Sequence, residues 1–230
     1  MTVSAPEIRY ERKLDVAGWD RPRLENLVRL HPAQWRELFP ERAVHSLYWD
    51  TAAFDSFFEH QSGVEKRLKT RLRWYGADLR AARGAALERK IKDGNIGIKE
   101  RFEVGDLSPF LSRPRAAWTA VWRQPGVPDR VRAEMLMRLP AVWTSYRRQY
   151  WLSRDQKFRL TLDHGITAGV WGQPPFKGLR MNFPSPILEI KYAVSADTDA
   201  AGLLQSFPFR PAKSSKYVTA AARLLELDRA

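Results

Sequence analysis

The sequence predicts an α+β fold: an antiparallel closed β-tunnel of about eight strands with a charged interior, flanked by helices that include a C-terminal helix. Short segments alternate polar and apolar residues at the period of a β-strand. One side of these segments carries charge that is mostly positive. The chain has 230 residues, of which 44% are hydrophobic and nine are Trp. This size and composition predict one domain over residues 1–230 with an ample core.

The strand predictions rest on the alternation alone. Because side chains i, i+2 and i+4 of a strand share a face, each segment separates into a charged and an apolar side. Asp93-Gly94, between two of the segments, predicts a hairpin turn. The predicted strands are Ile8–Leu14, His45–Thr51, Leu68–Trp74, Ala86–Lys92, Ile98–Val104, Ser145–Leu152, Lys157–Asp163 and Ile187–Tyr192.

Helical segments are expected to cover the apolar side of the sheet. Ser195 or Asp197, and Ser214 or Ser215, are the predicted N-caps of the last two. Phe176–Pro186 predicts a loop before the final strand because it contains Pro184 and Pro186. The predicted helices are Pro22–Leu38, Pro114–Trp122, Asp129–Leu139, Asp197–Gln205 and Ser215–Leu225.

The charged faces favour a tunnel over an ordinary sheet with one face in water, which remains the alternative. Neighbouring like charges destabilise a sheet, so selection for solubility would mix both signs. Inside a barrel the same cations would converge on a bound polyanion with little water to screen them. The charged positions are Arg9, Glu11, Lys13, Lys69, Arg71, Arg73, Glu88, Lys90, Lys92, Lys99, Arg101, Glu103, Arg148, Arg159, Asp163, Glu189 and Lys191.

The overall charge also indicates an anionic partner. A net charge of +13 and a pI near 10.2 attract nucleic acid, anionic lipid, nucleotides or polyphosphate. The absence of cysteine excludes disulfides and thiolate metal sites. No apolar run is long enough to span a bilayer, and Met1–Pro6 lacks the layout of a secretion signal. A cytoplasmic location is the simplest expectation.

Acidic residues on the charged faces suggest a metal site. Carboxylates bind Mg²⁺ or Mn²⁺ while Arg and Lys neutralise phosphate oxygens. Glu189 is the best candidate ligand, since its strand is otherwise strongly apolar. Glu11 and Glu88 are further candidates. For each acid, a salt bridge to a neighbouring base is the alternative role.

Nine short motifs, spread from residue 10 to residue 217, together resemble the VTC domain, the polyphosphate polymerase branch of the triphosphate tunnel metalloenzymes. They are Tyr10-Glu11-Arg12-Lys13, Ser46-Leu47-Tyr48-Trp49-Asp50-Thr51, Arg71-Leu72-Arg73-Trp74-Tyr75-Gly76, Leu87-Glu88-Arg89-Lys90, Lys99-Glu100-Arg101-Phe102, Tyr146-Arg147-Arg148, Arg159-Leu160-Thr161-Leu162-Asp163, Leu188-Glu189-Ile190-Lys191 and Ser215-Lys216-Tyr217.

The resemblance implies roles for individual residues. Glu189 would bind Mn²⁺ or Mg²⁺, and Glu11 and Glu88 remain the further candidates from the charged faces. Arg9 stands where related tunnel hydrolases carry an acid, which argues against a two-metal hydrolase. Lys216 also lies in the first turn of a predicted helix, a position that favours anions. The implied catalytic residues are Lys13, Arg71, Arg73, Lys90, Arg148 and Arg159. Lys99, Lys213 and Lys216 are the further phosphate-binding residues that the resemblance implies. The charged faces add Lys69, Arg101 and Lys191 as phosphate-binding candidates.

The implied reaction is phosphoryl transfer from ATP, or another nucleoside triphosphate, to a growing inorganic polyphosphate chain. A separate membrane protein is a possible partner. The alternatives are a triphosphatase or polyphosphatase of the same fold, and a non-catalytic module that binds polyphosphate or nucleic acid. Nucleic acid is the less favoured ligand, because Trp49, Trp74 and Trp151 lie opposite the charges and are expected in the core.

Overall fold

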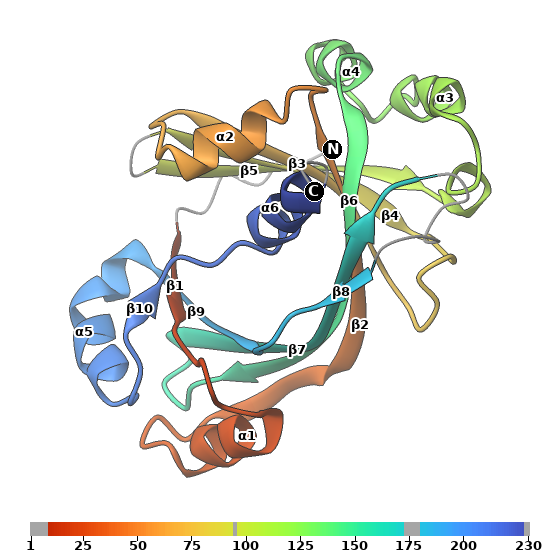
Figure 1. The fold of residues 1–230 in the computed structure, drawn as a ribbon. Helices are drawn as coiled ribbons and strands as arrows, with labels where there is room; N and C mark the ends of the chain where they lie inside the picture. Colours follow the sequence, from red (N-terminus) through yellow and green to blue (C-terminus); the bar gives the residue numbers. More distant parts are fainter. Residues whose placement is uncertain (1–8, 94–95, 173–179, 228–230) are drawn as a thin grey trace. The chain divides into compact units, whose positions relative to one another are not determined.

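The computed structural model describes residues 9–93, 96–172 and 180–227. In this part of the chain, ten β-strands alternate with six α-helices and three short 3-10 helices (Figure 1). The strands are β1 (Arg9–Leu14), β2 (Arg36–Asp50), β3 (Arg67–Tyr75), β4 (Ala85–Asp93), β5 (Ile96–Gly105), β6 (Leu139–Leu152), β7 (Phe158–Val170), β8 (Arg180–Asn182), β9 (Ile187–Ala193) and β10 (Pro211–Ala212). The α-helices are α1 (Arg21–Leu30), α2 (Asp55–Gln61), α3 (Thr119–Trp122), α4 (Asp129–Leu136), α5 (Asp197–Gln205) and α6 (Lys216–Leu227). The 3-10 helices are η1 (Ser108–Phe110), η2 (Arg115–Trp118) and η3 (Val194–Ala196).

The strands form a sheet in the order β10-β1-β9-β7-β6-β2-β3-β4-β5, and β8 pairs with β7. Antiparallel pairing is described for β1 with β9 and β10, for β7 with β9, for β2 with β3, for β3 with β4 and for β4 with β5. The predicted antiparallel sheet with flanking helices and a C-terminal helix is therefore confirmed. Its closure into a tunnel stays a prediction, because the described strand order runs from β10 at one end to β5 at the other. The prediction of about eight strands lacked the two shortest, β8 and β10.

The chain divides into two compact units, each assembled from three segments. Unit 1 contains residues 1–42, 146–166 and 182–214, and unit 2 contains residues 43–145, 167–181 and 215–230. That residues 1–230 act as one functional domain stays a prediction.

In unit 1, helices cover the apolar face of β1, β9 and β7. Leu160, Leu188 and Ile190 are fully buried there together with Leu24 and Val28 of α1. The predicted helix Pro22–Leu38 is too long, because α1 ends at Leu30 and β2 begins at Arg36. His31 has extended backbone angles and precedes Pro32, and a residue before proline is disfavoured in a helix.

In unit 2, the apolar face of β2, β3 and β4 packs against η2, α3 and α4. The Trp49 ring lies edge-on to the rings of Trp118 and Trp122, at centroid distances of 5.2 and 4.9 Å. Trp74 is fully buried in the same core, so Trp49 and Trp74 lie in the core as predicted. The predicted helices Pro114–Trp122 and Asp129–Leu139 also need correction: the first is η2 followed by α3, and the second ends at Leu136. Leu139 already belongs to β6, because the following Pro140 favours an extended backbone.

Several boundaries and caps differ from the prediction. Strands β2, β6 and β7 are longer than expected, and α2 was not predicted. Neither Ser195 nor Asp197 caps α5, which follows η3 and has Ala196 as its N-cap residue. Ser215 does cap α6, since its Oγ accepts a hydrogen bond from the Val218 amide at 3.4 Å. Gly94 of the predicted hairpin, and the first part of the predicted loop Phe176–Pro186, lie outside the described residues; the rest of that loop contains β8.

A polar cluster of unit 1 centres on Glu41 in β2. Its carboxylate accepts a hydrogen bond from Arg147, lies 2.8 Å from His164 Nε2 and lies 3.3 Å from Arg21 Nη2. Burial raises the pKa of Glu41, but these partners outweigh burial and lower the pKa from 4.5 to about 2. Because the folded protein binds the proton more weakly than the unfolded chain, the stabilisation is present above pH 4.5 and is lost as the pH falls toward 2.

We therefore expect Glu41→Gln to lower the free energy of unfolding by about 1 kcal/mol at pH 7, and the difference from wild type to shrink at pH 3. Urea unfolding at both pH values measures this difference. Glu37→Gln, an exposed change on the same strand, is the control and should change little at either pH. A loss in Glu41→Gln that is equal at both pH values would contradict an ionic origin.

Candidate functional site

In unit 2 the strands β3, β4 and β5 bring predicted phosphate-binding residues onto one face. Glu88 of β4 lies opposite Arg71 of β3 and Arg101 of β5, and Lys90 lies opposite Lys69 and Lys99. Alternation then places every second residue of the three strands on the same side. We call Arg71, Arg73, Glu88, Lys99 and Arg101 the Glu88 cluster.

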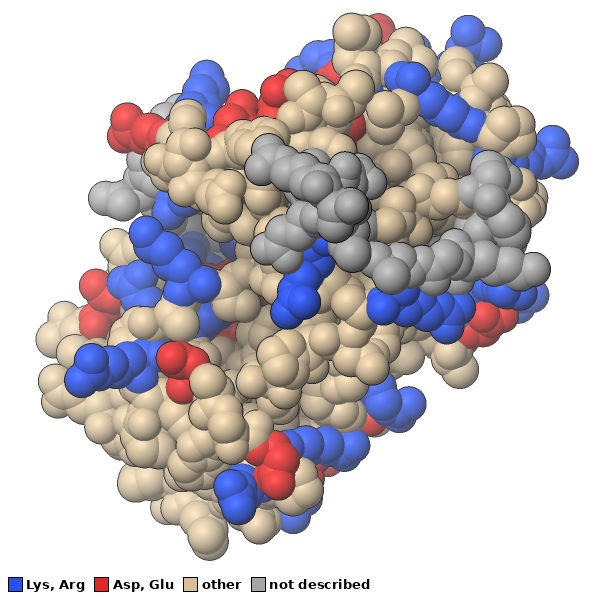
Figure 2. All heavy atoms as spheres, viewed as in Figure 1, with Lys and Arg blue, Asp and Glu red and all other residues tan. Residues whose placement is uncertain are grey.

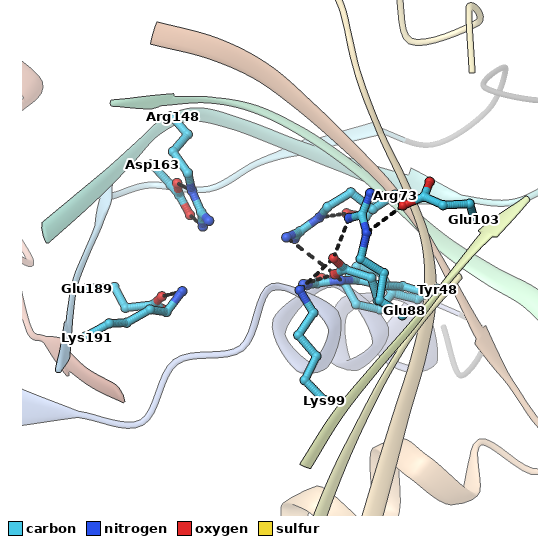
Figure 3. Close-up of polar contacts among 12 residues, drawn as sticks. Tyr48, Arg73, Glu88, Lys99, Glu103, Arg148, Asp163, Glu189 and Lys191 are labelled. Atoms are coloured by element: carbon cyan, nitrogen blue, oxygen red, sulfur yellow. Dashed lines mark hydrogen bonds and ion pairs between the residues drawn. The ribbon is translucent and has the colours of Figure 1, made fainter. Parts of the chain in front are cut away.

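Glu88 is the centre of this cluster, with 3% of its surface exposed. Its Oε2 accepts hydrogen bonds from Arg71 Nε at 2.9 Å and Nη2 at 2.7 Å, and Arg73 Nη1 lies 3.6 Å away. Its Oε1 accepts bonds from Lys99 Nζ at 2.7 Å and Arg101 Nη1 at 3.4 Å. Figure 3 shows the Arg73 and Lys99 side chains converging on this carboxylate.

The electrostatics of the cluster leave a surplus of positive charge. Burial raises the pKa of Glu88, but the charges of Arg71, Arg73 and Lys99 outweigh it and hold the pKa far below its ordinary value. Glu88 is thus ionised and has four cations around it, one of which, Arg101, also pairs with Glu103 at 2.7 Å, so the net charge is +2. Such a surplus, held by fixed side chains, is suited to binding phosphate oxygens. The contacts of Glu88 favour its alternative role as a salt-bridge partner over metal binding.

Two neighbouring groups were not predicted from the sequence. The Tyr48 hydroxyl accepts a hydrogen bond from Arg71 Nη1 at 3.3 Å, and Ser215 Oγ accepts one from Lys69 Nζ at 3.0 Å. Tyr48 lies opposite Arg71 in the pairing of β2 with β3, as Ser46 lies opposite Arg73. The polar alternation of Ser46, Tyr48 and Asp50 was the signal in the sequence that could have identified this face.

In unit 1 a second group lies on β1 and β9; we call Glu11, Lys13, Glu189 and Lys191 the Glu189 cluster. Lys13 lies opposite Glu189 in the strand pairing, and its Nζ lies 3.8 Å from Glu189 Oε2 and 3.5 Å from Glu11 Oε1. The same Nζ donates a hydrogen bond to the Ser214 carbonyl. Lys191 Nζ lies 2.5 Å from Glu189 Oε1, and Figure 3 shows these two side chains side by side.

Glu189 is buried yet ionised. Burial raises its pKa, but the charges of Lys191, Lys13 and Arg148 outweigh burial and hold the pKa well below its usual value. Its Oε1 is buried and, despite the nearby Lys191, accepts no hydrogen bond of acceptable geometry among the described residues. A buried carboxylate oxygen of this kind, with Glu11 close by, fits the oxygen ligands of Mg²⁺ or Mn²⁺, which often bind through one or two carboxylates plus phosphates and water. No group of three or more His, Asp or Glu residues with metal-binding geometry occurs in the described part of the chain.

The remaining predicted residues differ in their surroundings. Arg148 of unit 1 donates two hydrogen bonds to Asp163, at 2.5 and 2.7 Å (Figure 3). Burial lowers the pKa of Arg148, but Asp163 outweighs it and holds the pKa well above the ordinary value. Arg159, which lies opposite Lys191 in the strand pairing, is exposed. Lys90 and Lys213 are exposed as well, and Lys216 is partly buried.

Basic side chains are not restricted to these two clusters. Figure 2 shows Lys and Arg scattered over the visible face, with Asp or Glu beside several of them. What distinguishes the Glu88 and Glu189 clusters is therefore their buried carboxylates surrounded by cations.

Comparison with known proteins identifies the family. The VTC domain family matches residues 29–225. The chain belongs to the VTC domain family. This match covers most of both units of this VTC domain and confirms the resemblance seen in the motifs. No curated protein is detectably similar in sequence.

Solved structures confirm the fold of this VTC domain. One is from Vibrio parahaemolyticus and is provisionally described as an adenylate cyclase; it has a TM-score of 0.53 and 14% identity, over 93% of this chain and 97% of that chain. Another is from Hippeastrum, provisionally described as an adenylyl cyclase with a dominant triphosphatase activity; it has a TM-score of 0.51 and 18% identity, over 94% of this chain and 95% of that chain. At these identities the likeness establishes the fold alone.

None of the helices described in this VTC domain is both long and apolar enough to cross a membrane.

Proposed function

We propose that this VTC domain catalyses metal-dependent phosphoryl transfer from ATP to a growing inorganic polyphosphate chain. The observation that carries the proposal is the Glu88 cluster: four cations around one buried carboxylate, with a surplus charge of +2 once the Glu103 carboxylate on Arg101 is counted. Membership of the VTC domain family supports polyphosphate as the product. ATP and polyphosphate are the proposed substrates, and a separate membrane protein that receives the product is a possible partner.

The roles of the residues follow from their charge and surroundings. Arg71, Arg73 and Lys99 bind and orient phosphate oxygens, because guanidinium and ammonium groups form strong charge-assisted bonds with them. Glu189, with Glu11 as a second oxygen donor, would hold Mn²⁺ or Mg²⁺, which supplies neutralisation of charge on the transferring phosphate. Phosphoryl transfer depends mainly on such positioning and charge neutralisation. The other proposed phosphate-binding residues are Lys13, Lys69, Lys90, Arg101, Arg148, Arg159, Lys191, Lys213 and Lys216.

A triphosphatase or polyphosphatase of the same fold is the second candidate, favoured by the triphosphatase activity described for the Hippeastrum protein. The two reactions differ in their acceptor. A terminal phosphate is already ionised and needs no general base, whereas a water nucleophile must be oriented or deprotonated.

Incubation with ATP and Mn²⁺ distinguishes these reactions, and we expect long polyphosphate, detected by gel electrophoresis. Release of free phosphate without polymer would assign a hydrolase instead. If neither product forms but tripolyphosphate binds tightly, the protein would be a non-catalytic binding module. The absence of both turnover and tripolyphosphate binding would overturn the phosphate site itself.

A further inference from the structure

Three consecutive residues attach the start of α6 to the charged face of unit 2. Ser215 accepts a hydrogen bond from Lys69 at 3.0 Å. The Tyr217 ring stacks on the Tyr48 ring at 5.2 Å and 29°, and Tyr48 in turn contacts Arg71. Lys216 lies between Ser215 and Tyr217, the two residues that make these contacts. Burial raises the pKa of the Tyr48 phenol, but the charges of Arg71, Arg73 and Lys216 outweigh burial and lower this pKa. The first turn of α6 is thus part of the surroundings of the Glu88 cluster.

A fully buried carboxylate determines where this turn lies. Asp50, at the end of β2, is 0% exposed and accepts a hydrogen bond from the Tyr217 hydroxyl. It also accepts bonds from the backbone amides of Thr51 at 2.8 Å, Ser56 at 3.0 Å and Phe57 at 3.2 Å. The amides of α2 therefore fix the carboxylate, and the carboxylate fixes Tyr217. Helices α2 and α6 contact each other directly (Figure 1).

Asp50 and Tyr217 are too deeply buried to touch a substrate themselves. Tyr217 is only 2% exposed, and its hydroxyl is held in the protonated, donating form because burial and the Asp50 carboxylate raise its pKa. Arg138 Nη1 lies 3.6 Å from Asp50 Oδ1, so the carboxylate keeps a cationic partner without the hydroxyl. Loss of the hydroxyl would still remove one hydrogen bond to a charged group, which costs about 1–3 kcal/mol. The first turn of α6 would then lose its fixed position relative to β2.

We propose that the Asp50–Tyr217 hydrogen bond positions the first turn of α6 so that Lys216 presents its charge to phosphate bound at the Glu88 cluster. This inference rests on the proposed phosphate-binding function and adds two positioning residues to it. Neither residue contributes charge to the ligand; both act through Lys216.

A double-mutant cycle tests this role. Tyr217→Phe keeps the ring and its stacking on Tyr48 but removes the donor, and we expect tripolyphosphate affinity to fall about tenfold. Lys216→Ala should also weaken binding. The double variant should bind no more weakly than Lys216→Ala alone, because the charge that Tyr217 positions is already absent. Isothermal titration calorimetry with tripolyphosphate measures all four proteins.

The matched control is Tyr192→Phe in unit 1, which removes a tyrosine hydrogen bond to Asp197 of 2.9 Å and should leave the affinity at the wild-type value. An equal loss in this control, additive losses in the cycle, or wild-type affinity in Tyr217→Phe or Lys216→Ala would each overturn the inference. If Tyr217→Phe does not fold in buffer alone, all four proteins are titrated in the presence of a stabilising osmolyte such as sucrose, with the same expected result. Failure of the wild-type protein to bind tripolyphosphate would instead overturn the proposed function.

Discussion

Replacing Arg71 or Arg73 by alanine is expected to abolish triphosphate binding while leaving the fold intact. Both guanidinium groups lie at the centre of the Glu88 cluster, and paired charge-assisted hydrogen bonds to phosphate contribute about 3 kcal/mol, a loss of about 100-fold in affinity or more. Glu88 keeps three of its four cationic partners in either variant, so no unpaired buried charge remains. Calorimetric titration with tripolyphosphate measures the effect.

The control for the loss of one positive charge is Arg154→Ala. Arg154 is exposed in the turn between β6 and β7, where it hydrogen-bonds Gln34 at 2.8 Å. This variant should bind tripolyphosphate like wild type, since Arg154 is outside the Glu88 cluster and an exposed charge is screened by salt. Thermal unfolding of all three variants separates lost binding from lost folding. Wild-type affinity in both Arg71→Ala and Arg73→Ala would show that the phosphate site lies elsewhere.

The strand patterns made the Glu88 cluster predictable, because alternation alone assigns Arg71, Glu88 and Arg101 to charged faces. Antiparallel pairing of β3, β4 and β5 then brings those faces together. The sequence could not show that Glu88 binds four cations at once, since this depends on the register of the three strands. The alternation was equally compatible with Glu88 as a metal ligand and with Glu88 as a salt-bridge partner.

Contacts between residues far apart along the chain could not be predicted from the sequence, for a related reason. Asp50 and Tyr217 are separated by 167 residues along the chain, and no periodicity connects a strand end with the first turn of a helix so distant. The end of α1 at Leu30, by contrast, could have been predicted from the His31-Pro32 pair, because a residue before proline is disfavoured in a helix. The helical periodicity after Pro32 led instead to the longer predicted helix. Local backbone preferences could therefore be predicted from the sequence, whereas contacts between residues far apart along the chain could not.

Replacing Glu189 by glutamine is expected to remove metal-dependent activity. The amide has nearly the shape of the carboxylate but no charge, so it cannot hold a divalent cation with comparable strength. Lys13 and Lys191 are partly exposed, with 20% and 31% of their side-chain surfaces accessible, and can turn to water once the carboxylate is neutral. We expect Mn²⁺-stimulated turnover to fall about 100-fold, the scale at which lost charge stabilisation affects phosphoryl transfer.

The matched control is Glu25→Gln, another isosteric change in unit 1, where Glu25 is paired with Arg21 and Gln149. It should retain full Mn²⁺-stimulated turnover. Direct Mn²⁺ titration followed by electron paramagnetic resonance separates lost metal binding from lost chemistry. The Glu189 variant should bind Mn²⁺ weakly, yet it should still bind tripolyphosphate at the Glu88 cluster, which it leaves unchanged. Undiminished Mn²⁺-stimulated turnover in Glu189→Gln would move the metal to other ligands, because a buried oxygen that coordinates the ion cannot lose its charge without effect.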